Sequence, residues 1–184
     1  MATALARKVD MNLFATNTEP ELAARDLDDK RLVKMVLETA QLLSTALRVN
    51  GVDCVELYKA THANHPVNVW VRNTRSNFLW TVEYGLRICD EYQHRYGRTH
   101  GSRSAVHAAA ELYRYITDGP LEEFHNSARN LGKGLDFTSL PVVDAYRAYL
   151  VARWNTETPR WTKRGIPSWL SQKNLTNVVE NMHA

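Results

Sequence analysis

Apolar residues recur every three or four positions over residues 28–48, and this pattern constrains the fold more than any other feature. They are Leu32, Met35, Val36, Ala40, Leu43 and Leu47. The spacing places them on one face of an α-helix, and Asn50-Gly51 supplies a C-terminal cap signal. A helix of this length must bury its apolar face against other elements, so the chain needs a helical core.

Four further helices are predicted by similar signals. A short one over 20–26 follows a capping threonine and a proline. A long one over 67–95 carries a break near 72–76, a third covers 103–117, and the last covers 141–154. Only 8 glycines and 6 prolines interrupt the 184 residues, which favours helices throughout.

The fold class expected from these patterns is all-α, as a single compact helical domain over residues 11–184. Residues 1–10 have no clear pattern and are predicted to be an N-terminal extension. Residues 120–126 could add a turn of helix, and 127–140 is predicted to be a loop. A chain of 184 residues buries a sizeable core, so we expect no metal or disulfide staple.

The location is predicted to be cytoplasmic. Cys54 and Cys89 form no CxxC pair, which indicates a reducing compartment. The first residues contain no apolar signal segment, and no apolar run is long enough to cross a membrane. The oligomeric state is not predicted.

A polar stripe follows the first long helix. Its members are Arg31, Lys34, Glu38, Gln41 and Thr45, which share one face. One interpretation is an ordinary solvated face with a weak Lys34–Glu38 pair. The other is a carboxylate held between cationic groups in a cleft, with Glu38 as acid, base or electrostatic stabiliser.

Aromatic and basic residues alternate between residues 61 and 100. The candidates for nucleic-acid contact there are His65, Arg72, Arg75, Asn77 and Arg95. Bases stack on aromatic rings while arginines neutralise phosphates. The alternative is that the aromatic residues, Trp80 and Tyr84 above all, belong to the core.

Histidines are frequent in the same region, at His62, His65, His94 and His100. Two ligands at His62 and His65, with Cys89 or Glu91 as a third, would suit a metal ion. Because the spacing is loose, we predict neither a metal site nor another cofactor.

The C-terminal tail is basic and aromatic, with Arg160, Trp161, Lys163 and Arg164 in a compact group. It suits contact with a phosphate backbone and one stacking residue. It could also be a strap that packs Trp161 and Trp169 onto the domain, and both can hold. The net charge of only +3 permits a nucleic-acid partner without requiring one.

In several places the sequence resembles the pyrimidine-dimer DNA glycosylase family, the endonuclease V type of phage and bacterial repair enzymes. The similar segments are 11–14 (MNLF), 27–32 (LDDKRL) followed by Lys34, Glu38 and Gln41, His65-Pro66 with Trp70, Tyr84-Gly85-Leu86 followed by Cys89, Glu91, Arg95 and Gly97, and 159–165 (PRWTKRG).

This resemblance implies an all-α enzyme that cuts the N-glycosidic bond of a damaged pyrimidine and then breaks the strand at the abasic site. It implies no metal and a double-stranded DNA partner from which a base must be extruded. Glu38 falls on the position of the family's catalytic glutamate, and Arg31 falls where phage members have a histidine. Lys30, the arginines of the 61–100 region and the tail would hold the DNA.

The resemblance also implies an amine nucleophile that forms a Schiff base. In the family this is the α-amine of the processed N-terminus, which has a lower pKa than a lysine. It would belong to Asn12 if Met11 were removed, or to Ala2 if the chain starts at Met1. Lys34, one turn before Glu38, is the substitute.

Two alternatives to a glycosylase remain from the sequence. One is a DNA- or RNA-binding or assembly protein of the same fold without catalysis. The other is a metal-dependent nuclease or base-modifying enzyme built on the histidines.

Overall fold

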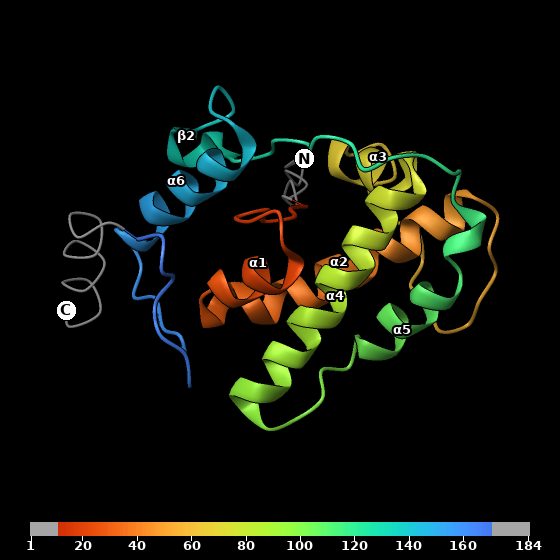
Figure 1. Cartoon of the computed structure of the whole chain (residues 1–184), viewed down its shortest axis with the longest axis horizontal. Coiled ribbons are helices and arrows are strands. Elements are labelled where there is room, and N and C mark those ends of the chain that lie inside the picture. The colour runs from red at the N-terminus through yellow and green to blue at the C-terminus, as the bar shows by residue number, and fades with distance from the viewer. Residues whose placement is uncertain (1–10, 171–184) are drawn as a thin grey trace, which may run out of the picture.

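A computed structural model describes residues 11–170; the predicted N-terminal extension, 1–10, and residues 171–184 lie outside the described residues. Over that range the protein is mainly helical, which confirms the expected class (Figure 1). The helices are α1 (Pro20–Asp26), α2 (Asp29–Val49), α3 (Pro66–Asn73), α4 (Arg75–Tyr96), α5 (Arg103–Glu111) and α6 (Val142–Trp154). None of the helices in residues 11–170 is long and apolar enough to span a bilayer.

Helix α2 lies at the centre of the fold. It packs against α3, α4 and α5, while α1 packs against α4. The apolar stripe predicted from the sequence is buried, since Leu32, Met35 and Leu43 have no exposed surface. The buried apolar residues of 11–170 form a single cluster.

The predicted long helix over 67–95 is two helices, with the break at Thr74. The backbone of Thr74 is extended, and its Oγ1 accepts a hydrogen bond from Asn77 N at 3.2 Å as the N-cap of α4. The same hydroxyl donates to Pro120 O at 2.8 Å. At the other end, Gly97 closes α4 with a left-handed backbone, φ 69°.

Three predicted segments differ in the structure. Residues 120–126, where the sequence allows a further turn of helix, contain no helix. The helix expected over 103–117 ends at Glu111, and a 3₁₀ turn, Tyr113–Tyr115, follows it. The loop expected over 127–140 contains a small antiparallel hairpin of β1 (Arg129–Asn130) and β2 (Leu135–Asp136). Strands of two residues are too short for an alternating pattern to reveal, and Gly134 makes the turn with φ 67°.

Helices α2 and α4 approach each other closely where Gly85 faces α2. A Cβ atom at Gly85 would lie 3.2 Å from Thr39 Cγ2 and 3.0 Å from Val106 Cγ1. A side chain there would push α4 away from α2 and α5. The glycine therefore allows the two helices to cross closely at Thr39.

The chain beyond α6 returns to the helical core as a strap, residues 155–170, whose ribbon is blue in Figure 1. Asp29 N donates to Arg160 O at 2.8 Å, which ties the strap to the start of α2. The ring of Trp161 is buried and packs edge-on against Trp154 at 5.0 Å. Of the two uses considered for the tail, packing onto the domain is the one that the structure shows.

Candidate active site

Glu38 lies on α2 with its carboxylate inside the protein. Its side chain is only 5% exposed, while that of Lys34, one turn earlier, is 60% exposed. Lys34 Nζ lies 2.8 Å from Glu38 Oε1. The pair is therefore not a solvated surface pair: a buried carboxylate meets an ammonium at the protein surface.

Tyr84 on α4 interacts electrostatically with ionisable groups on three other elements. Tyr84 on α4 is fully buried, and burial raises the pKa of its phenol, with smaller upward contributions from Tyr146, Asp26 and Glu38. Burial also raises the pKa of Asp26, although a 2.7 Å hydrogen bond from Thr16 Oγ1 opposes the rise. The low polarity of this region strengthens any electrostatic interaction with a reacting group.

The segment that precedes α1 enters the fold beside two cavities. Met11 and Asn12 are both buried and line a cavity of about 400 Å³, together with His65, Arg129 and Leu131. A second cavity of about 640 Å³ shares Pro66 with the first and is lined by Trp70 and Phe124 among others. Each is large enough to take in part of a nucleotide.

Arg31 is held in ion pairs at the base of the strap. Its side chain is 7% exposed, and it contacts Asp28 at 2.8 Å and Glu157 at 3.1 Å. Burial acts to raise the pKa of Glu157, but hydrogen bonding from Arg153 and the charge of Arg31 outweigh it and lower the pKa to about 2. Arg31 thus anchors the strap beside α2 rather than projecting a free charge.

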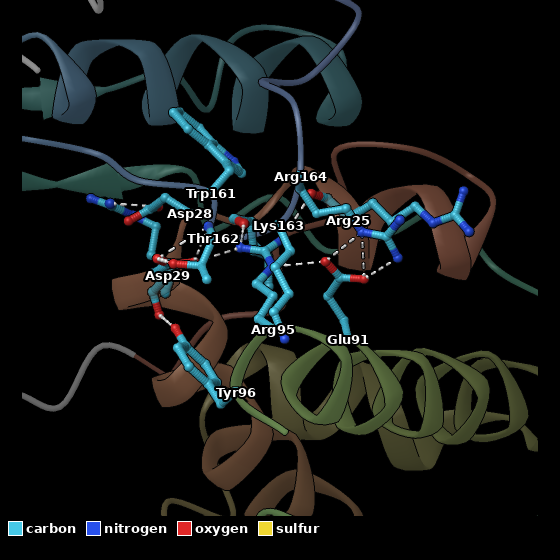
Figure 2. A network of polar contacts seen from close by, with 12 residues as sticks. Arg25, Asp28, Asp29, Glu91, Arg95, Tyr96, Trp161, Thr162, Lys163 and Arg164 are labelled. Carbon is cyan, nitrogen blue, oxygen red and sulfur yellow. Dashed lines mark hydrogen bonds and ion pairs between the residues drawn. The ribbon is translucent and has the colours of Figure 1, made fainter. Parts of the chain in front are cut away.

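Arg95 is the centre of a buried network (Figure 2). Its side chain has no exposed surface, and it donates to Glu91 Oε1 at 2.7 Å, Asp29 Oδ1 at 3.0 Å and the carbonyl oxygens of Leu27 and Arg25. Arg164 in the strap contacts the other oxygen of Glu91 at 2.9 Å. All of these bonds connect one part of the protein to another. Arg95 and Arg164 therefore stabilise the fold.

The remaining candidates for DNA contact fall into two groups. Asn77 is fully buried, and its side-chain amide donates to Trp70 O and to Glu122. His65 caps the N-terminus of α3. Arg72 donates to Ala63 O, and Arg75 forms an ion pair with Asp118. These four side chains therefore bond to neighbouring segments of the protein. Lys30, Arg160 and Lys163 are exposed, and Lys30 lies on α2 one turn before Lys34.

The histidines of the described part of the chain do not gather around a metal site. Within residues 11–170, no three His, Cys, Asp or Glu side chains lie close enough to hold an ion. His65 caps α3, and His100 packs edge-on against Tyr92 at 4.8 Å. The histidine-based alternative has no support in this part of the chain.

Comparison with known families decides how the chain is classified. The family model for pyrimidine dimer DNA glycosylase matches residues 11–103, just over half of the chain. The chain belongs to this family. No curated protein and no solved structure matches it.

The matched region runs from the buried Met11-Asn12 segment through α4, and it includes Lys34 and Glu38. The hairpin, α6 and the strap lie beyond it. Sequence reasoning missed Asp26, Tyr146 and Arg129 as parts of the site. Tyr146 and Arg129 lie far along the chain from α2. No local pattern signals that Asp26 and Tyr146 interact electrostatically with Tyr84 or that Arg129 lines the cavity beside Asn12.

Proposed function

We propose that this protein is a DNA glycosylase that excises damaged pyrimidines, pyrimidine dimers in particular, from double-stranded DNA. The observation that carries the proposal is the buried carboxylate of Glu38, which meets a surface ammonium inside the segment that matches the family. DNA glycosylase activity is what the family's description implies; the roles of individual residues are our proposal.

The proposed chemistry uses an amine and Glu38 together. The amine attacks C1′ of the damaged nucleotide and the bond from C1′ to the base nitrogen breaks. The base nitrogen takes a proton from solvent, and in a pyrimidine dimer the base stays joined to its neighbour by the cyclobutane ring. The new bond opens the sugar to a Schiff base. Glu38 accepts a proton from the attacking amine, returns it to the ring oxygen O4′ as the sugar opens, and stabilises the cationic sugar. Loss of the C2′ proton then breaks the bond to the 3′ oxygen, which is the lyase step.

The surface around Lys34 supports contact with the DNA backbone. Lys30 and Lys34 are on exposed positions of α2, and the strap brings Arg160 and Lys163 to the start of the same helix. Cations so placed neutralise phosphates and position the duplex. The buried network of Arg95, with Trp161, would act indirectly, by holding the strap in place.

Access to the sugar requires the damaged nucleotide to leave the stack, at a cost of a few kcal/mol. The cavity of about 400 Å³ beside Asn12 offers space for an extruded group. Arg129 lies in its wall and supplies a charge suited to phosphate.

Borohydride trapping tests the Schiff base and names the amine. The full chain is incubated with ultraviolet-irradiated duplex and with duplex carrying an abasic site, then reduced and digested, and the cross-linked peptide is identified by mass spectrometry. We expect a covalent adduct on an N-terminal amine or on Lys34. Salt-dependent binding without cleavage of the glycosidic bond or of the strand would instead favour a non-catalytic binding protein.

A further inference from the structure

The hairpin of β1 and β2 presents a leucine to solvent at its tip. Leu131 follows β1 directly and is 69% exposed, which makes it one of the most exposed large apolar side chains among residues 11–170. A single exposed leucine is ordinary on a protein surface. The rigid support and the charged neighbours of this leucine need a separate explanation.

The hairpin is anchored in the protein core. Its two strands pair antiparallel, and Gly134 N donates to Leu131 O at 3.1 Å to close the turn. Beyond the strand ends, Phe137 N donates to Ala128 O at 3.0 Å, and Ala128 has no exposed surface. These bonds hold Leu131 in a fixed position on the surface.

Cations lie on both sides of the leucine. Arg129 in β1 and Lys133 in the turn are both exposed, and residues 124–135 contain no acidic residue. Asp136 is opposite Arg129 in the register of the hairpin, but its Oδ1 accepts two hydrogen bonds from Thr138. The tip therefore combines positive charge with one apolar side chain, which suits a polyanion that also offers an apolar surface.

The hairpin also forms part of the wall of the cavity beside Asn12. Arg129, Leu131 and Gly132 line this space of about 400 Å³ together with Met11 and Asn12. Because Leu131 lines the cavity and is also largely exposed, it lies at the mouth. In the proposed function this cavity receives a group extruded from the duplex, so the leucine lies beside the gap that the group leaves.

We propose that the hairpin tip is a DNA-binding wedge: Leu131 enters the base stack beside the extruded nucleotide, and Arg129 and Lys133 contact the phosphates on either side. The inference rests on the proposed function for its partner, duplex DNA. Apolar side chains inserted between base steps kink DNA and so increase its contact with the protein, while the cations contribute salt-dependent affinity. The wedge lies beyond residues 11–103, the segment that matches the family model.

Leu131→Ala tests the wedge, and Leu121→Ala is the control because Leu121 is also a loop leucine, 50% exposed. Leu131→Met keeps a long apolar side chain at the tip. The full chain and each variant are titrated into a duplex that carries a stable tetrahydrofuran abasic analogue next to 2-aminopurine, whose fluorescence rises when it unstacks. Circular dichroism confirms that each variant is folded.

For the wild type we expect the fluorescence to rise on binding. Leu131→Ala should bind about tenfold more weakly, because burial of a leucine side chain corresponds to at least that change in affinity, and it should lose most of the rise. Leu121→Ala and Leu131→Met should match the wild type. Arg129→Gln and Lys133→Gln should each lower the salt slope of binding by about one, whereas Leu131→Ala should leave the slope unchanged.

Wild-type affinity and a full fluorescence rise in folded Leu131→Ala would overturn the inference, as would a wild type that binds no duplex. Cleavage of ultraviolet-irradiated duplex is measured separately. A wild type that unstacks the duplex through Leu131 but cuts no glycosidic bond would refute the proposed function and support the wedge. Cleavage by the wild type, with Leu131→Ala equal to it in both assays, would refute the wedge and support the proposed function.

Discussion

Replacing Arg95 by methionine removes a buried charge while keeping most of the side-chain volume. The guanidinium has no exposed surface and serves two carboxylates, Glu91 and Asp29, and two backbone carbonyls. Breaking one side of a buried ion pair costs about 3–5 kcal/mol. Because Glu91 keeps Arg164 while the carbonyls lose their donor, we expect a loss within that range.

Arg87→Met is the control on the same helix. Arg87 also pairs with the glutamate four residues before it, Glu83, but both side chains are more than two-fifths exposed. An exposed pair of this kind contributes about 0.5 kcal/mol or less. Urea unfolding at pH 7, followed by circular dichroism, compares both variants with the wild type.

The same pair of variants separates a structural role from DNA contact. If Arg95 holds the strap, its loss lowers stability strongly and affects DNA binding only through the strap. Stability within 1 kcal/mol of the wild type, together with weaker DNA binding and a shallower salt dependence, would refute the reasoning.

Three further predictions follow from the strap. Because the pKa of Glu157 is lowered to about 2, its ionised carboxylate stabilises the folded state fully above about pH 4.5, and this contribution is lost as the pH falls toward about 2. Glu157→Gln should therefore lower the free energy of unfolding in urea at pH 7 and have little effect near pH 2. Trp161→Ala should cost roughly 3–5 kcal/mol in the same assay because the ring is buried, and a cost below 1 kcal/mol would contradict that packing. Arg160→Ala and Lys163→Ala should each reduce the salt slope of DNA binding by about one without changing the unfolding midpoint; unchanged slopes would remove both from the proposed DNA surface.

Helices could be predicted where the signal is local. The apolar repeat of residues 28–48 and the proline at position 20 lie within the helices that they specify. Both helices begin and end within a residue or two of the predicted positions. The break between α3 and α4 was also visible, but its cause was not. Thr74 is extended partly because it bonds to Pro120, far along the chain.

The candidate site was predictable in its centre and less so at its edges. Glu38 and Lys34 are one helical turn apart, so their pairing follows from spacing. Arg95 and Trp161 have the residue types of a DNA-binding surface, yet the structure buries both. Their partners are 66 and 135 residues away, and no pattern in one sequence reveals such pairs.

The most direct test of Glu38 is single-turnover base release from a duplex with one thymine dimer at a defined position. It is measured as thymine freed after photoreversal, because the cut base stays joined to its neighbour through the cyclobutane ring. Wild type and Glu38→Gln are compared at equal DNA occupancy, with urea unfolding to confirm that the variant is folded. We predict that the variant binds the duplex normally and releases the base at least 10²-fold more slowly, the scale of a lost acid–base group. Base release at the wild-type rate by the folded variant would contradict a catalytic role for Glu38.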